Sequence, residues 1–318
     1  MKNFLDYASK MYYAGEPIIS DDEFDSLVEY YGYEGSVGAP IVGDRIAHAF
    51  PLYSLQKCYD DEPMIDLGGE VVVTPKLDGA AVALYYAEGR LVLALTRGDG
   101  KEGLDITEKM RTLAPNHLEF VGHFVQITGE IVAPKSIENA RNYAAGALNL
   151  KSLDEFKSRE LTFVAYGLTP SDNQFWVNDM IQLHNYGFNT AYTCSEEFLS
   201  QFPHDGLVHR LNDNQKFQAL GYTAKHPRGA FALKERGEGV ITRLLGVEWQ
   251  VGRSGKVTPV GILEPITIGE ATVQRATLNN PKYIQDLNLE LGCLVLVERA
   301  GMIIPRVIRR IYVEEENS

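Results

Sequence analysis

A lysine between two strand-like runs constrains this chain more than any other feature. The run Val71-Val-Val-Thr-Pro-Lys76 is rich in β-branched residues and leads into Leu-Asp78-Gly79, after which a second apolar run continues to Tyr86. The pattern predicts two strands with the lysine at the edge of a site. Partial desolvation there would favour the neutral, nucleophilic amine. The same four residues, Lys-x-Asp-Gly, are also compatible with a solvated lysine in a hairpin turn.

Composition predicts a globular protein of two or three domains. The chain has 318 residues, 45% of them hydrophobic, and no apolar stretch approaches the ~18 residues that span a bilayer. The N-terminus runs into a helical pattern and lacks a signal-peptide core. Cys58, Cys194 and Cys293 are widely separated, which argues against a disulfide framework and against a structural zinc site. We therefore expect a cytoplasmic protein, in the host cytoplasm if it is viral, with no membrane partner.

Charge is distributed unevenly along the chain. The net charge is −13, which is unusual for a nucleic-acid-binding protein. Residues 1–66 hold 4 Lys+Arg against 13 Asp+Glu, whereas residues 237–318 hold 9 against 10, and three of those acids are the terminal Glu314-Glu315-Glu316. Affinity for a phosphate backbone depends on local clusters rather than on net charge. The negative charge of the N-terminal segment is also compatible with an ordinary solvated surface.

Three segments differ in their secondary-structure pattern. Over residues 3–14 apolar residues recur at helical spacing, and Ser20 with Glu23 forms a capping box that opens a second helix, closed by Gly32. Residues 40 to 236 mix short alternating runs with helical pieces, including strands on either side of Glu88-Gly89 and a helix over 136–148 with a break at its glycine. This mixture fits an α+β domain with antiparallel sheets. After residue 240 we expect short strands over 247–251, 256–260, 262–268 and 293–298, as in a small barrel.

Further motifs follow the lysine in a dense series. Thr96-Arg97-Gly98-Asp99-Gly100 lies about one hairpin downstream and continues to Asp105-Ile-Thr107. The later members are Gly129-Glu130, Ala140–Leu148, Leu161–Gly167, Asp205-Gly206, Ala232–Lys234, Gln250–Val260, Ala276–Asn280 and Arg299–Pro305. In order and density this series resembles the NAD-dependent DNA ligases, which are covalent nucleotidyltransferases. The resemblance covers nearly the whole chain.

The resemblance implies three domains and an overall α+β architecture. These are a helical nicotinamide-recognition domain over residues 1–35, an adenylation nucleotidyltransferase domain with antiparallel sheets over 36–236, and a β-barrel OB-fold that binds DNA over 237–318. Full-length bacterial relatives continue into zinc, helix-hairpin-helix and BRCT modules, which this sequence does not contain. The chain is therefore either a compact natural enzyme of the phage or viral kind or a trimmed core, and its acidic tail and short N-terminal domain favour the former.

The resemblance also implies the reaction and its nucleophile. Lys76 would attack the α-phosphorus of NAD, release nicotinamide mononucleotide and hold AMP as a lysyl-AMP phosphoramidate. AMP would pass to the 5′-phosphate of a nick in duplex DNA, and the 3′-hydroxyl would then displace it. The other catalytic residues implied are Asp78, which supports the lysine and Mg²⁺, and Arg97, which steers the leaving nucleotide. The expected role is in DNA replication or repair.

Several residues would hold the nucleotide, as the resemblance implies. Glu130 would bind the ribose hydroxyls and, with Asp205, the Mg²⁺ ion; Lys234 would grip the α-phosphate. The adenine would lie between Tyr166 and Val208. The remaining implied contacts to NAD are Ser54, Leu55 and Arg210 and, for the nicotinamide, Tyr12, Tyr13, Asp21 and Asp25.

Nicked duplex DNA is the implied partner, bound by a monomer. The matching residues are Arg141 in the adenylation domain and Arg253, Ser254 and Arg299 in the OB-fold. The sequence departs from the family pattern at four positions. Thr74 stands in place of a glutamate that contacts adenine, Arg210 in place of a phosphate-contacting lysine, Asn149 in place of an arginine, and Gly229 in place of a tryptophan.

Two other functions are compatible with these motifs. One is an ATP- or GTP-using nucleotidyltransferase, either a ligase or a capping enzyme, in which no nicotinamide is recognised. The pair Tyr12-Tyr13 with Asp21 and Asp25 argues against it. The other is a non-catalytic module that binds nicks, against which the complete set of charged motif residues argues.

Overall fold

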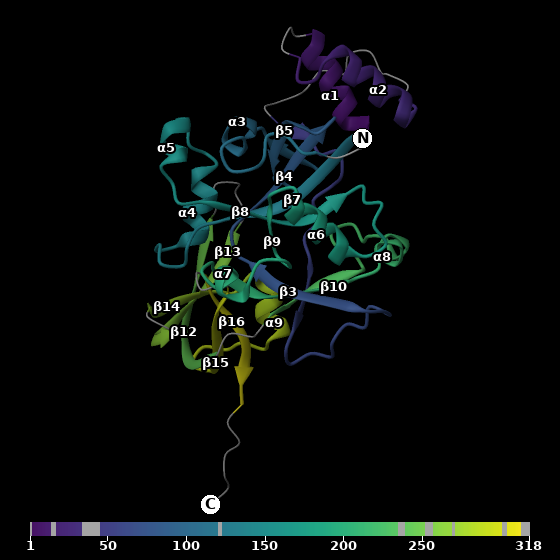
Figure 1. Ribbon diagram of the computed structural model, residues 1–318. Helices are drawn as coiled ribbons and strands as arrows, with labels where there is room; N and C mark the ends of the chain where they lie inside the picture. The colour runs from purple at the N-terminus through teal and green to yellow at the C-terminus, as the bar shows by residue number, and fades with distance from the viewer. Residues whose placement is uncertain are drawn as a thin grey trace, which may run out of the picture. The chain divides into compact units, whose positions relative to one another are not determined.

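The computed structural model describes residues 2–13, 17–33, 45–119, 123–234, 239–251, 257–268, 271–300 and 304–312. The chain divides into two compact units, residues 1–234 and residues 235–318. Figure 1 labels the helices and strands of both units. The first contains helices and three sheets, and the second contains a closed barrel. No helix in the described ranges is long and apolar enough to cross a membrane. The division into three domains stays a prediction.

Two helices begin the first unit, α1 (Lys2–Tyr13) and α2 (Asp21–Tyr31). The expected capping box between Ser20 and Glu23 is present, and Gly32 ends α2 in the left-handed conformation. Their apolar faces, with Phe4, Leu5 and Leu27, share one hydrophobic cluster with strands of the neighbouring sheet. The helical hairpin and the body of the first unit therefore have a common core.

A five-stranded sheet forms the centre of the first unit. Its order is β5-β4-β7-β8-β9, and its bounds are β4 (Ala80–Ala87), β5 (Arg90–Thr96), β7 (Phe124–Val132), β8 (Thr162–Thr169) and β9 (Asn189–Thr190). Strand β4 is apolar on both faces: Leu84 and Tyr86 belong to one core cluster, and Tyr85 belongs to the cluster under α1 and α2. Burial of both faces explains why this run has little polar alternation. The tight turn predicted at Glu88-Gly89 is confirmed, with both residues at positive φ.

A second, four-stranded sheet carries the lysine. Its order is β2-β11-β10-β3, with β2 (Gln56–Tyr59), β3 (Val71–Leu77), β10 (His204–Leu211) and β11 (Ala230–Lys234). Strand β10 is antiparallel to both neighbours, whereas β2 runs parallel to β11. One face of the sheet packs around Cys58, Leu211 and Phe231. The remaining strands in the described part of this unit are a short pair, β1 (Arg45–Ala47) with β6 (Glu102–Leu104).

Short helices connect these sheets. They are α3 (Thr107–Met110), α4 (Ala140–Ala147), α5 (Leu153–Lys157), α6 (Trp176–Asn185), α7 (Glu196–Leu199) and α8 (Asn214–Leu220). The helix expected over residues 136–148 is shorter than predicted, because Asn139 is left-handed, with φ of 51°, and helical geometry starts after it. Gly146 lies inside α4 and does not break it.

The second unit is a closed barrel with strand order β12-β13-β14-β16-β15. Its elements are β12 (Val240–Val251), β13 (Val257–Ile268), β14 (Ala271–Thr277), α9 (Pro281–Asp286), β15 (Leu294–Ala300) and β16 (Ile304–Ile311). Leu244, Val295 and Val307 are among its buried core residues. The expectation of separate strands over 256–260 and 262–268 is wrong, because one strand, β13, is continuous over Val257–Ile268 and Gly261 pairs with both β12 and β14.

Candidate active site

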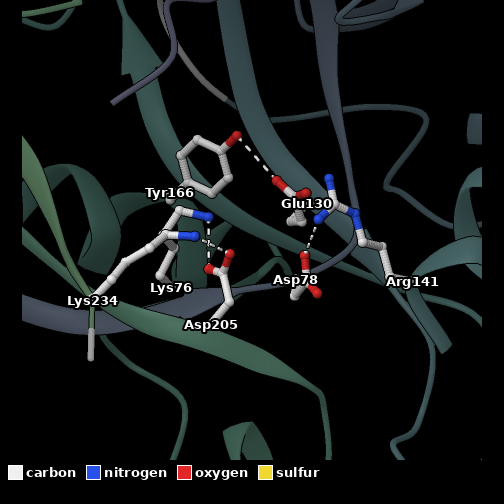
Figure 2. A network of polar contacts seen from close by, with 7 residues as sticks. All are labelled: Lys76, Asp78, Glu130, Arg141, Tyr166, Asp205 and Lys234. Carbon is white, nitrogen blue, oxygen red and sulfur yellow. Dashed lines mark hydrogen bonds and ion pairs between the residues drawn. The ribbon is translucent and has the colours of Figure 1, made fainter. Parts of the chain in front are cut away.

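Asp205 lies between two lysines on the four-stranded sheet. Lys76, near the end of β3, places Nζ 2.8 Å from Asp205 Oδ1, and Lys234, at the end of β11, contacts Oδ2. Figure 2 shows both amines directed at this carboxylate. Strand β10 runs between β3 and β11, and its register against β3 shifts between His204 and Leu207. Asp205 lies within this register shift, between Lys76 and Lys234.

The charges of Lys76, Asp205 and Lys234, here called the triad, do not cancel. Burial raises the pKa of Asp205, but hydrogen bonds from Lys234 and Lys76 outweigh it and hold that pKa below its usual range. The carboxylate is therefore ionised at neutral pH. Two ammonium groups then share one negative charge, and the excess positive charge favours an anion such as a phosphate beside the lysines.

A second carboxylate, Glu130 on β7, lies in a different environment. Burial raises its pKa to about 7, although the charge of Lys76, a hydrogen bond from the Gly79 backbone N–H and one from Tyr166 all act to lower it. The Tyr166 hydroxyl on β8 donates to Glu130 Oε2 at 3.4 Å (Figure 2). Glu130 therefore changes its charge near neutral pH, unlike Asp205.

Asp78 and Gly79 connect the two sheets. Burial raises the pKa of Asp78, and Arg141 on α4 pairs with its carboxylate at 2.9 Å. The Asp78 backbone N–H donates to the carbonyl of Pro203 at 2.8 Å. A Cβ at Gly79 would lie 2.1 Å from the Ile131 carbonyl oxygen, so a larger residue could not pass this close to β7. The glycine of the Lys-x-Asp-Gly motif is thus required by packing.

Arg97 follows β5 and is fixed through its backbone. Its N–H donates to Ala81 at 3.0 Å, and its carbonyl accepts from His48 Nε2 at 3.1 Å. His48 is buried, and burial lowers its pKa, so the ring is neutral; its Nδ1 lies 2.6 Å from the Tyr85 hydroxyl. Arg97 Nε is buried without a hydrogen-bond partner in the described residues. Sequence reasoning missed His48, because one buried histidine in an apolar segment has no distinguishing pattern.

Of the two residues expected on either side of the adenine, Val208 lies on β10 of the four-stranded sheet and Tyr166 lies on β8 of the five-stranded sheet. Val208 pairs with Thr74 on β3 and with Ala232 on β11, which puts these side chains on one face. Ser54 lies just before β2, and its carbonyl accepts from His226 Nδ1 at 2.8 Å. Leu55 is half-buried beside it.

Arg210 lies apart from the lysine triad. Its guanidinium donates to the Leu211 carbonyl at 2.6 Å and to Asn214 Oδ1 at 2.9 Å, and it lies over the Phe217 ring. Burial lowers its pKa to about 10, so it remains charged at neutral pH. Of the other departures, Asn149 contacts the Ala145 carbonyl at 3.4 Å, and Gly229 precedes β11.

Comparison with known proteins identifies the family. The model described as NAD-dependent DNA ligase adenylation domain matches residues 44–198, and the model described as NAD-dependent DNA ligase OB-fold domain matches residues 241–318. The chain belongs to the NAD-dependent DNA ligase family. The expected order, an α+β adenylation domain followed by an OB-fold barrel, is therefore confirmed.

Individual relatives agree with this assignment. A DNA ligase of Desulfosudis oleivorans is 32% identical over 97% of this chain and 56% of its own length, and one of Aquifex aeolicus is 31% identical over 94% and 51%. The chain thus spans about half of the length of these ligases. A solved structure described as "DNA binding with a minimal scaffold: Structure-function analysis of Lig E DNA ligases" has a TM-score of 0.51 and 16% identity, covering 84% of this chain and 100% of that one. This likeness concerns the fold alone.

Some expected contacts of this family member lie outside the described residues. They are the side chains of Tyr12, Tyr13, Asp21, Asp25 and Arg299, and the whole of Arg253 and Ser254. Their roles stay predictions, as do the roles of the residues described above.

Proposed function

We propose that this protein is an NAD-dependent DNA ligase that seals nicks in duplex DNA through a lysyl-AMP intermediate. The observation that carries the proposal is the Lys76–Asp205–Lys234 triad, beside Glu130 and Tyr166, in a chain of this family. The excess positive charge of the triad suits the α-phosphate of NAD, which is a substrate of the reaction.

The first step forms a bond between Lys76 Nζ and the α-phosphorus. The bond to the bridging oxygen breaks, and nicotinamide mononucleotide leaves with the electron pair. Lys76 must lose a proton to solvent before its amine can attack. Asp205, 2.8 Å from Lys76 Nζ, stays ionised and orients both lysines. Lys234 remains beside the phosphate and stabilises the charge that develops on its oxygens.

The described residues fit a magnesium ion bound largely by substrate. Mg²⁺ usually binds one or two carboxylates together with phosphates and keeps several waters. The described ranges contain no group of three or more His, Cys, Asp or Glu residues that could hold a metal ion. Glu130 and Asp205 would hold the ion. When bound, it would neutralise charge on the phosphate oxygens.

After adenylation the protein would transfer AMP to the 5′-phosphate of a nick, and the 3′-hydroxyl would then displace AMP. Arg97 lies close enough to Tyr166 for its charge to influence that hydroxyl, which supports a place for Arg97 beside the bound nucleotide. Nicked DNA would be bound by Arg141 of the first unit and by Arg253, Ser254 and Arg299 of the barrel.

Covalent labelling tests the proposal. The protein is incubated with Mg²⁺ and NAD labelled in its adenylate, or with labelled ATP, and separated under denaturing conditions. We expect labelling by NAD alone, followed by sealing of a nicked duplex. Labelling by ATP alone would overturn the choice of substrate. Binding to nicks without labelling by either nucleotide would instead identify a non-catalytic module.

A second experiment tests the nicotinamide contacts. Tyr12→Ala combined with Asp25→Ala should block labelling by NAD but spare sealing of a nick that already carries a 5′-adenylate, since that step needs no nicotinamide. An equal fall in both activities would mean that the helical hairpin is structural only. Lys2→Ala, an exposed change in the same hairpin, serves as the control.

A further inference from the structure

Strand β3 is an edge strand of the four-stranded sheet. Among the described residues its one neighbouring strand is β10, which pairs with β11 on its other side. The Asn212 N–H, just after β10, donates to the Glu70 carbonyl, just before β3, at 2.9 Å. Hydrogen-bonded pairs recur at every second residue of an antiparallel ladder, so the backbone groups of Val72 and Thr74 bond to β10. The backbone groups of the alternate residues therefore point away from the sheet.

These outward groups belong to Val71, Val73 and Pro75. The N–H and carbonyl groups of the two valines make no hydrogen bond to any residue that the structure describes. Pro75 has no N–H, so it hinders pairing at the end of the strand nearest Lys76. Exposed edges are usually protected by charged side chains or by proline, and the Val71–Val73 segment has neither. This segment is therefore open to a further strand.

The side chains of the same segment form an apolar surface. Val71 and Val73 are 37% and 47% exposed, and Leu207 on β10 is 40% exposed. Leu207 pairs with Pro75, so it lies on the same face of the sheet as the two valines. Lys76 alternates with these residues and lies on the opposite face. A ligand on the apolar surface is therefore separated from the candidate nucleophile by the sheet.

An acidic loop crosses this apolar face. Residues 60–70 connect β2 and β3, which lie at opposite edges of the sheet, and Leu67 of the loop packs with Leu211 and Phe231. Leu211 lies on the same face as Leu207, since the two alternate regularly along β10. The loop contains no Lys or Arg, and its exposed acids are Asp60, Asp61, Glu62, Asp66 and Glu70.

We propose that the Val71–Val73 edge of β3 binds an extended, basic segment of a partner protein as an added strand. The outward backbone groups take the main-chain hydrogen bonds, and alternate apolar residues of the partner cover Val71, Val73 and Leu207. Lysines or arginines of the partner face the acidic loop. A second copy of this chain is a poor occupant, because pairing of two β3 edges would place two acidic loops on one face. The proposal goes beyond nick sealing and does not depend on it.

Binding of synthetic peptides to the full chain tests the proposal. The probe is a short peptide with blocked ends in which arginine and valine alternate, and fluorescence anisotropy measures its Kd. One matched peptide has glutamate in place of arginine, and another has methyl groups on alternate backbone nitrogens. The probe should bind, and each matched peptide should bind roughly tenfold more weakly or worse, because the first is repelled by the loop and the second lacks main-chain donors.

Variants of the edge locate the binding site. Val73→Lys places a like charge against the basic peptide and should raise its Kd by roughly tenfold or more. Val257→Lys is the matched control, because Val257 on β13 is 48% exposed and the change in net charge is the same. It should leave the Kd unchanged. Glu70→Lys should raise the Kd several-fold and flatten its salt dependence.

Hydrogen exchange shows whether the peptide binds as a strand. In protein with isotope-labelled valines, the bound peptide should slow exchange of the Val71 and Val73 N–H groups. The Val72 N–H, which already bonds to β10, should exchange at an unchanged rate. Protection of this alternating kind is expected only when the added segment pairs with the edge.

Several outcomes would overturn the proposal. Equal affinity for the arginine and glutamate peptides would remove the role of the acidic loop, and an unchanged Kd in Val73→Lys would remove the role of the edge. Binding without protection of Val71 and Val73 would indicate general attraction to an acidic chain. Self-association of the free protein that Val73→Lys abolishes would assign the edge to a second copy. If melting temperatures show that Val73→Lys is unfolded, the methylated peptide and Glu70→Lys decide the question.

Discussion

The two large sheets of the first unit use their surfaces differently. The five-stranded sheet is covered by apolar clusters on both faces, and the middle residues of β4 are fully buried. The four-stranded sheet is apolar on one face around Phe231, while its other face carries Lys76, Asp205 and Lys234. The five-stranded sheet therefore contributes mostly to stability, although β7 and β8 also carry Glu130 and Tyr166 of the candidate site. The four-stranded sheet presents charges where a nucleotide could bind.

The contrast extends to the carboxylates. Glu130 projects from the buried sheet, and burial raises its pKa to about 7. Asp205 belongs to the charged sheet, where two lysines hold its pKa below the usual range. The protein environment thus raises the pKa of one carboxyl group and lowers that of the other. Asp205 is a fixed negative charge, and Glu130 can change its charge near neutral pH.

The largest expected effect is on the charged sheet. Lys76→Ala should abolish self-adenylation and nick sealing, because no other group at that position can attack the phosphorus. The melting temperature should change little, since the Lys76 side chain is 27% exposed and contributes little to packing. Lys157→Ala, an exposed change on α5, is the matched control. Retained labelling would remove Lys76 from its role.

On the buried sheet the effect should be on stability. Leu84→Ala removes a side chain that is 0% exposed and should lower the free energy of unfolding by about 2–5 kcal/mol. Val208→Ala, on the half-exposed centre of the charged sheet, should cost clearly less. Urea unfolding of both variants measures the difference. Equal losses would mean that the two sheets do not divide stability and chemistry in this way.

The two carboxylates should respond differently to pH. Ionised Glu130 accepts hydrogen bonds from the ribose hydroxyls more strongly than the protonated form, so labelling by NAD should rise with pH through about 7 and then level off. Glu130→Gln should remove this dependence. Because the folded pKa lies above the unfolded one, the stability contributed by Glu130 is present at low pH and is lost as pH rises towards 7. A wild-type rate that is flat between pH 6 and pH 8 would contradict this prediction.

The smallest expected effect is in the barrel. Arg253→Ala or Arg299→Ala should weaken binding to nicked DNA and flatten its logarithmic salt dependence by roughly one unit, because each contact to a phosphate releases about one counterion. Labelling by NAD should be unaffected. Unchanged affinity and slope in both variants would direct attention to Lys101, Lys135 and Arg141 as the basic surface.

Local signals in the sequence predicted much of this structure. The capping box at Ser20, the turn at Glu88-Gly89 and the strand before Lys76 depend on neighbouring residues, and all three are present. The start of α4 was missed because it depends on the left-handed Asn139, which side-chain periodicity does not reveal.

Contacts between residues that are far apart in the sequence were harder to predict. The motifs named Lys76, Asp205 and Lys234 separately, but their salt bridges depend on the order of strands and on a register shift in β10. The support of Arg97 by His48 and the space that Gly229 leaves for Phe217 arise only from packing. Packing contacts of this kind produce no characteristic spacing of residues, so they cannot be predicted from the sequence.

The pairing of β3 with β10 has a consequence for synthesis of the chain. Lys76 and Asp205 are 129 residues apart, and the strands β4, β5, β7 and β8 lie between them in the sequence. The buried sheet can therefore begin to close while the partners of Lys76 are still on the ribosome. Pairing across so long an interval is intrinsically slow. A nascent chain consequently exposes its nucleophile without the carboxylate or the second lysine, and the triad is completed only after residue 234 has emerged.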